Sequence, residues 1–360
     1  MNSGYNSNFN RSGIESKFSA VKGKVGVLIV NLGTPDSTST GDVRRYLRQF
    51  LMDDRVIDIP FLSRWFLVNI IIAPFRAPKS AEVYKKVWLP EGSPLKVYGY
   101  SVEKKLQAAL GEKFVVKLGM RYQNPSIESA IKELQSADIE RIIVVPFFPQ
   151  YASATTGSVH QEVMRIVQGW PIIPDISFIN QYFDHPGLIE GFAQSAKAWL
   201  DKQDYEHYVF SYHGLPERQL GKAYVNSEHN CEAAGCRKEI TAENQHCYLA
   251  QCYETTKLIA NRLGISPDKI STCFQSRLGK DPWIQPYTEV VVKELAAKGI
   301  KKVLAFSPAF VADCLETTEE VGIEYRDMFI EEGGEVWDLV ESLNESDIWV
   351  NTLVDLVYKV

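Results

Sequence analysis

The chain has 360 residues, a net charge of −6 and an apolar content of 45%, typical of a globular protein with room for two α/β domains. The negative charge offers no basic footprint for nucleic acid, and no uncharged apolar run approaches the roughly 18 residues of a transmembrane helix. Residues 1–24 are polar and lack the apolar core of a secretory signal, so we predict a disordered tail and a cytoplasmic protein, at most loosely attached to a membrane.

Short apolar runs alternate with helical patterns along the chain, which predicts an α/β fold with largely parallel sheets. In the first half we predict strands over 25–30, 114–118 and 142–145, and helices over 42–50, 103–110 and 127–134. In the second half we predict strands over 208–212, 270–274, 303–306 and 336–340, and helices over 187–200, 252–263, 287–297 and 347–358.

The segment 56–75 is apolar nearly all round, yet it contains Arg64 and Asn69. A buried core helix is one interpretation. The other is an exposed lip, over 61–75, that meets a membrane surface or an apolar ligand. The basic residues that follow would suit anionic head groups or ligand carboxylates, although a solvated basic face is commoner: Arg76, Lys79, Lys85, Lys86 and Lys96.

A row of carboxylates follows the strand predicted over 303–306. Asp313, Glu316, Glu320 and Glu324 are spaced by three, four and four residues, which places them on one face of a helix. A charged row is usually a solvated face, and carboxylates near a helix start favour its dipole. On this segment alone, the solvated interpretation is the simpler one.

The two halves of the chain contain similar motifs in the same order. VLIVNLGTP at 27–35 is similar to YVFSYHGLP at 208–216, and residues 130–146 are similar to 291–308. We therefore predict two similarly built, Rossmann-like doubly wound domains over 25–180 and 181–344, with a closing helix over 345–360. Neither first turn carries the GxGxxG fingerprint, so no nucleotide is expected.

The repeat also shows where the halves differ. The second half has His213 and Glu316 where the first has Leu32 and Ala154. Both positions follow the carboxyl end of a strand, where open α/β sheets bind ligands. We therefore predict a cleft between the domains, with an apolar first wall and the chemistry on the second.

A polar insert over 222–252 contains four cysteines in a C-x4-C-x10-C-x4-C pattern: Cys231, Cys236, Cys247 and Cys252. Four thiolates satisfy the ligand count for zinc or for a [2Fe–2S] cluster. Common zinc ribbons use C-x2-C, so this spacing is not theirs, and unligated cysteines stay an alternative. We expect this centre to be structural or sensing.

Several motifs together resemble the ferrochelatase family, from about Val25 to Asn344. They are VNLGTPDS, APFRAPKSAEVYKKVWLPEGSPL, MRYQNPS, PFFPQYASATTGS, SYHGLPER, TCFQSRLGKDPW and SPAFVADCLETTEEV. The resemblance implies two chelatase domains and a lyase that inserts ferrous iron into protoporphyrin IX, with loss of two pyrrole protons, to make protohaem. It also implies that the lip over 61–75 contacts porphyrin and membrane, and that the cysteine insert holds a [2Fe–2S] cluster.

The resemblance also implies roles for individual residues. His213 and Glu316 would flank the macrocycle centre as catalytic residues and iron ligands, and Asp313, Glu320 and Glu324 would line a path for metal or protons. Neutral imidazole is a natural acceptor of pyrrole protons, and carboxylates hold ferrous iron. The residues expected to shape the pocket are Asn31, Leu32, Arg121, Tyr122, Tyr151, Ser211, Gln275, Trp283 and Phe310.

Other functions stay open from the residues alone. A chelatase for coproporphyrin or another tetrapyrrole would use the same cleft, although the apolar lip favours protoporphyrin. A carrier would bind porphyrin or metal without turnover. An iron–sulfur redox protein would rest on the cysteines alone and leave the repeat unexplained.

Overall fold

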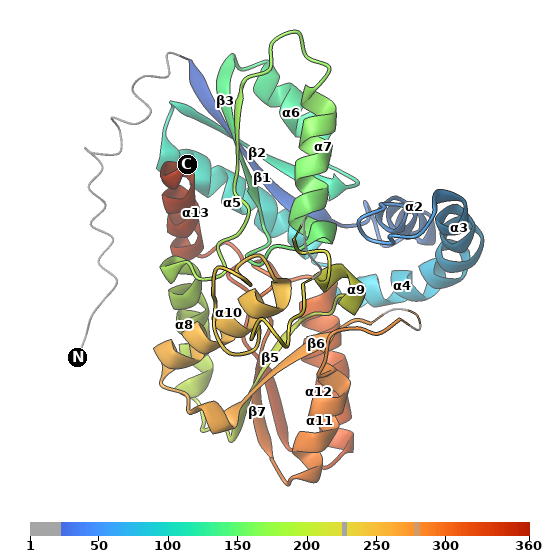
Figure 1. Cartoon of the computed structure of the whole chain (residues 1–360), viewed down its shortest axis with the longest axis vertical. Helices are drawn as coiled ribbons and strands as arrows, with labels where there is room; N and C mark the ends of the chain where they lie inside the picture. The colour runs from blue at the N-terminus through green and yellow to red at the C-terminus, as the bar shows by residue number, and fades with distance from the viewer. Residues whose placement is uncertain (1–22, 225–228, 278, 280) are drawn as a thin grey trace.

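A computed structural model describes residues 23–360 of the chain, apart from 225–228, 278 and 280. The tail predicted over 1–24 therefore lies almost wholly outside the described residues. Two α/β halves stack end to end along the long axis of the molecule, and a helical arm projects from the first (Figure 1).

The first half is built on a parallel four-stranded sheet with the order β2-β1-β3-β4. Its strands are β1 (Lys24–Gly33), β2 (Phe114–Tyr122), β3 (Ile139–Pro146) and β4 (Asp175–Phe178). Helices cover both faces, so the central strand β1 is a continuous apolar run, and Val25 and Val27–Val30 have no exposed surface. The edge strand β4 was not predicted, because its partly exposed residues form no apolar run.

The second half repeats this design with the order β6-β5-β7-β8. Its strands are β5 (His207–His213), β6 (Ile270–Gln275), β7 (Lys302–Phe306) and β8 (Val336–Leu339). The strand orders match position by position, which confirms the predicted pair of similar doubly wound units.

The helices of the first half are α2 (Thr40–Leu51), α3 (Phe61–Phe66), α4 (Ala73–Val87), α5 (Pro94–Leu110), α6 (Ile127–Gln135) and α7 (Ser158–Val167), with π-helical segments η1 (Leu67–Ile72) and η2 (Ser153–Gly157). Helix α5 begins nine residues before the predicted start at 103. Pro94 occupies the first turn of α5, where the backbone N–H that proline lacks would have no partner within the helix.

The helices of the second half are α8 (Pro186–Leu200), α9 (Glu217–Leu220), α10 (Tyr248–Leu263), η3 (Pro267–Lys269, 3-10), α11 (Thr288–Ala297), η4 (Glu316–Glu324, π-helical), α12 (Tyr325–Glu331) and α13 (Asp347–Lys359). The C-terminal helix α13 packs against both α5 and α8 and so joins the two halves. The π-helical segments η2 and η4 follow β3 and β7, the equivalent strands of the two sheets.

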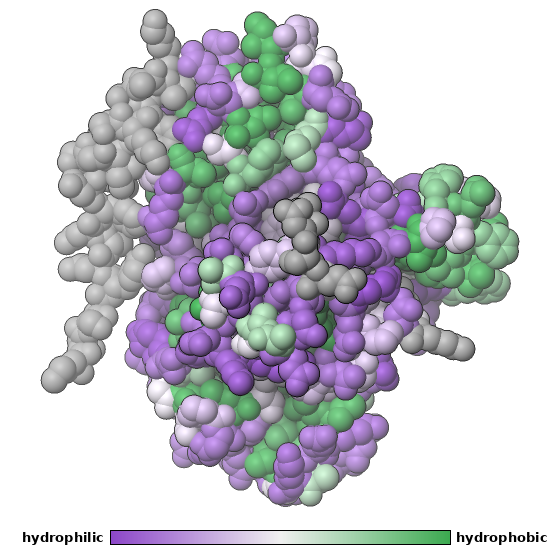
Figure 2. Space-filling view, in the orientation of Figure 1, coloured by the Kyte–Doolittle hydropathy of each residue, from purple (hydrophilic) through white to green (hydrophobic). Residues whose placement is uncertain are grey.

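The segment that begins at 56 is a projecting arm and not a core helix. Leu62 and Phe75 are each 80% exposed, and hydrophobic residues gather on this arm over α3 (Figure 2). Arg64 points inward instead, and its guanidinium donates hydrogen bonds to the carbonyl oxygens of Ile57 and Ile59 at 3.0 and 3.1 Å. The described residues contain no helix both long and apolar enough to cross a bilayer.

Candidate functional site

A cleft between the two halves is lined by residues that follow the strand ends of both sheets. The space within it is about 1320 Å³, open solvent at its mouth included. Leu32 and Ala154 line it from the first half, and His213 and Glu316 line it from the second. The four positions that the repeat placed at equivalent strand ends therefore meet in one cavity.

The first wall is largely aromatic and aliphatic. Helices α2 and α4 contribute Tyr46, Phe50 and Tyr84, and the segment after β3 contributes Phe147 and Phe148. Sequence reasoning did not select these residues, because apolar positions on helices indicate core packing as readily as a ligand wall. This wall suits a flat apolar macrocycle.

His213 is the last residue of β5, where it lies beside Gln275 of β6. Its Nδ1 is 2.7 Å from the carbonyl oxygen of Gly214. Because a carbonyl can only accept, Nδ1 carries the proton, and the Nε2 of the neutral ring keeps its lone pair. The indole of Trp283 lies 6.5 Å from the imidazole, between ring centres, and also lines the cleft.

Glu316 opens the π-helical segment η4, and its backbone oxygen accepts a hydrogen bond of 3.1 Å from the Gln275 side chain. π-Helical turns occur frequently at functional sites. Across the cleft, Tyr46 and Tyr84 are buried; burial raises their pKa well above the usual value, and the Glu316 carboxylate raises it further. Both phenols therefore stay neutral against the carboxylate.

Glu320 and Glu324 continue from Glu316 along η4. The Glu320 carboxylate accepts hydrogen bonds from Gln275 at 3.1 Å and from the Tyr325 hydroxyl at 3.0 Å. Burial raises the pKa of Glu324, and the nearby carboxylates of Glu320 and Glu319 raise it further. A carboxyl group with a raised pKa exchanges protons closer to neutral pH than one with the usual pKa.

Asp313 does not belong to this row. It precedes η4, and its carboxylate accepts hydrogen bonds from the Asn344 amide at 2.7 Å and from the backbone N–H of Ser342 at 3.1 Å. The expected placement of Asp313 on the same helix face as the glutamates was therefore wrong, because the chain is not helical until after it.

The residues expected to shape the pocket fall into two groups. Four of them line the cleft: Asn31, Leu32, Trp283 and Phe310. The other five are not among the lining residues and support it from behind: Arg121, Tyr122, Tyr151, Ser211 and Gln275.

Asp53 organises part of this supporting layer. Its carboxylate accepts from the Arg121 guanidinium at 2.7 Å, the Tyr122 hydroxyl at 2.9 Å and the Ser158 hydroxyl at 2.5 Å. Burial opposes ionisation, but these partners and the Arg55 N–H together lower the pKa of Asp53. The charged network holds β2 against the start of α7 behind the first wall.

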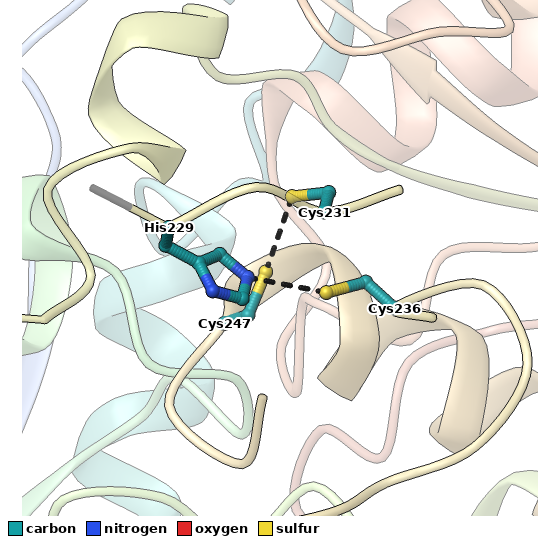
Figure 3. Close-up of side chains that lie close together, drawn as sticks. All are labelled: His229, Cys231, Cys236 and Cys247. Atoms are coloured by element: carbon teal, nitrogen blue, oxygen red, sulfur yellow. Dashed lines mark hydrogen bonds between the residues drawn. The ribbon is translucent and has the colours of Figure 1, made fainter. Parts of the chain in front are cut away.

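The insert forms a compact group of metal-ligand side chains (Figure 3). The donor atoms of His229, Cys231, Cys236 and Cys247 all lie within 4.8 Å of one another. Hydrogen bonds from the other two thiols lower the pKa of Cys247. Cys252, the fourth cysteine of the expected ligand set, is outside this group, and His229, which sequence reasoning did not select, is within it.

Three comparisons relate this geometry to known proteins. The ferrochelatase family profile matches residues 24–360. The ferrochelatase of Coxiella burnetii (strain Dugway 5J108-111) is 44% identical over 351 residues, 96% of each chain, and that of Legionella pneumophila (strain Lens) is 42% identical over 335 residues, 92% of this chain and 98% of the other. The sirohydrochlorin chelatase SirB from Bacillus subtilis subspecies spizizenii shares the fold at 11% identity, with a TM-score of 0.52 over 92% of this chain and 93% of that one.

Proposed function

The chain belongs to the ferrochelatase family, a family of lyases, and from this premise we propose how its cleft inserts ferrous iron into protoporphyrin IX in haem biosynthesis. His213 and Glu316 are the catalytic pair. The observation that carries this assignment is the asymmetry of the cleft, where Leu32 and Ala154 occupy the equivalent places on the opposite wall. The two walls share the same strand-end geometry, so the imidazole and carboxylate on one wall identify it as the reactive wall.

His213 accepts the pyrrole protons. Nδ1 donates to the Gly214 carbonyl oxygen across 2.7 Å, so Nε2 is the basic atom of the ring. The two macrocycle protons must leave as iron enters, and a neutral imidazole accepts protons near neutral pH. The apolar first wall holds the porphyrin flat against this base.

The glutamates bring iron in and carry protons out. Glu316 contacts the substrate iron at the cleft, while Glu320 and Glu324 extend the carboxylate row away from it along η4. Carboxylate oxygens are ligands for ferrous iron and accept protons in turn. Gln275 links the Glu316 backbone to the Glu320 side chain and so holds the first step of this path in place.

An anaerobic assay with protoporphyrin IX and ferrous iron tests the assignment. We expect the four visible bands of the free base to give way to a haem spectrum, and Glu316→Gln to lower this rate by about 10²–10⁴-fold. The variant should still bind porphyrin, because the apolar wall is unchanged. A protein that binds porphyrin but never inserts iron or zinc would be a carrier, and a variant with normal turnover would refute the role of Glu316.

For the insert, we propose a resident metal centre, and the positions of its donor atoms argue against a [2Fe–2S] cluster. A [2Fe–2S] cluster on Cys231, Cys236, Cys247 and Cys252 needs four thiolates divided between two irons. Three of the thiolates converge, but Cys252 lies outside the group, and a histidine nitrogen stands among them. The expected four-cysteine cluster therefore does not fit this arrangement.

The exposed arm is our proposed contact with a membrane surface. Its apolar side chains point outward from α3 and η1, and exposed Arg76 and Lys79 follow on α4. Apolar residues beside basic ones are typical of segments that lie in the interface of anionic membranes. This arrangement supports a cytoplasmic localisation with a peripheral contact to the membrane.

A further inference from the structure

We propose that His229, Cys231, Cys236 and Cys247 bind one metal ion in a closed tetrahedral site of the zinc class. This centre is separate from the iron that is the substrate of the cleft. It replaces the two-iron cluster expected from the four cysteines with a single ion held by three thiolates and one imidazole.

The distances between donor atoms support a single ion. The Sγ atoms of Cys231 and Cys247 are 3.6 Å apart, and Nε2 of His229 is 3.2 Å from Sγ of Cys236. Zinc bonds of ≈ 2.3 Å to sulfur and 2.0–2.1 Å to nitrogen give tetrahedral edges of about 3.5–3.8 Å. Both pairs therefore need little movement to become edges of one tetrahedron. A cluster with two irons would place two pairs of donors on different metals and spread them further.

Backbone hydrogen bonds shape the loop around these donors. The N–H of Cys236 donates to the Cys231 carbonyl at 3.0 Å, and the N–H of Cys247 donates to the Asn244 carbonyl at 2.8 Å. The fully buried Asn244 side chain also donates to the carbonyls of Ala234 and Glu239, both at 2.9 Å. These hydrogen bonds hold the ligand-bearing parts of the loop close together in the fold.

Burial is consistent with a closed structural ion. Cys236 and Cys247 are buried, and His229 and Cys231 are half-buried. Four protein ligands leave no position for water, which distinguishes a structural zinc site from a catalytic one. The ion would therefore stabilise the insert and take no part in exchange with the substrate.

Helix geometry explains why Cys252 is not a ligand. Cys247 is the N-cap of α10, and Cys252 lies five residues further along, about 7.5 Å up the helix axis and on another face. Cys252 is fully buried in the core. Bringing its sulfur to the site would unwind the first turn of α10.

That first turn connects the site to the cleft. Tyr248 follows the ligand Cys247, and its hydroxyl donates a 2.9 Å hydrogen bond to the carbonyl of His213. An ion on Cys247 would anchor this end of α10 and so help position the catalytic histidine. Loss of the ion is then expected to slow iron insertion without removing any group that contacts porphyrin.

The test is metal content and cobalt spectroscopy of the full-length protein. Protein purified from medium with zinc and iron should hold one zinc and no inorganic sulfide per chain. Co²⁺ added to the metal-free, reduced protein should give the intense red-region bands of a tetrahedral thiolate site. His229→Ala should weaken metal retention at least tenfold, whereas Cys252→Ala, a buried cysteine outside the group, should retain the full amount.

A second variant keeps the test decisive if His229→Ala fails to fold. His229→Cys offers four thiolates, so it should bind one ion and shift the cobalt charge-transfer bands toward those of an all-sulfur site. Two irons with two sulfides, bands that bleach with dithionite, metal loss in Cys252→Ala alone, or no bound metal at all would each overturn the proposal. Activity in the cleft is scored separately, so failure here leaves the assignment of His213 and Glu316 standing.

Discussion

The two halves of this molecule share a strand order but place different side chains at the ends of equivalent strands. At the carboxyl ends of the central strands β1 and β5 stand Leu32 and His213, and after β3 and β7 stand Ala154 and Glu316. The π-helical segments η2 and η4 occupy the same place in each half. The comparison teaches that the repeat supplies the geometry of a two-walled cleft, while a few substitutions on one wall supply its chemistry.

Exchanging the base for a small side chain should produce the largest effect. His213→Ala removes the Nε2 acceptor, so we expect the turnover number for iron insertion to fall about 10²–10⁴-fold while porphyrin still binds. The matched change on the other wall, Leu32→Ala, should mainly raise KM, because it removes only apolar contact. Rates and quenching of porphyrin fluorescence measure both. Equal losses of turnover in the two variants would contradict the division of roles between the walls.

The outer carboxylate should matter less than the pair at the macrocycle. Burial and two neighbouring glutamates raise the pKa of Glu324, so the folded protein holds its proton above the usual pH and loses stability as pH rises through that raised pKa. Glu324→Gln should therefore slow insertion roughly tenfold and also raise the melting temperature at pH 7, but not below about pH 4.

Glu319→Gln is the control for this change. It lies on the same segment but pairs with the exposed Lys86 at 2.8 Å, so its loss should change stability little and leave the rate near normal. If Glu324→Gln lowers the melting temperature at pH 7, the ionised Glu324 carboxylate stabilises the folded protein instead of destabilising it. A proton path through it would then lose its support.

The arm distinguishes the halves in a different way, because among the described residues only the first half extends one from its sheet. Replacing Leu62 and Phe75 by serine should weaken binding to anionic vesicles at least tenfold, since burying each side chain is worth about 1.5–3 kcal/mol. Ile172→Ser, which changes an equally exposed side chain between α7 and β4, should leave binding unchanged. If vesicle binding persists and KM for porphyrin rises instead, the arm contacts porphyrin and not a membrane.

The smallest effect concerns half-buried His160 in the first half and buried His207 in the second. Burial lowers the pKa of His160 and of His207 to about 4, so both are neutral in the folded protein and charged more readily when it unfolds. Stability should therefore fall as pH drops from about 6.5 to 4. Glutamine at either position should flatten the pH dependence of denaturant midpoints in this window. An unchanged slope would show that neither histidine governs acid sensitivity.

Much of the fold was predictable because the strands bury both faces. Continuous apolar runs mark β1 and β7, and the repeat between the halves predicts a common topology for the two sheets. Strand β4 was missed because an edge strand needs only one packed face and its residues are partly exposed. The start of α5 was missed because its first turn depends on Ser93 and Pro94 and not on apolar periodicity.

The candidate site divides along the same line. The sequence by itself determined which kinds of side chain carry the chemistry, because an imidazole and a row of carboxylates at strand ends indicate a reactive site without coordinates. Only the tertiary structure separated Asp313 from that row, and only it replaced Cys252 by His229 in the metal-ligand group. The reason is physical: spacing along the chain predicts faces within one helix, whereas the convergence of side chains from loops depends on hydrogen bonds and packing that no local pattern records.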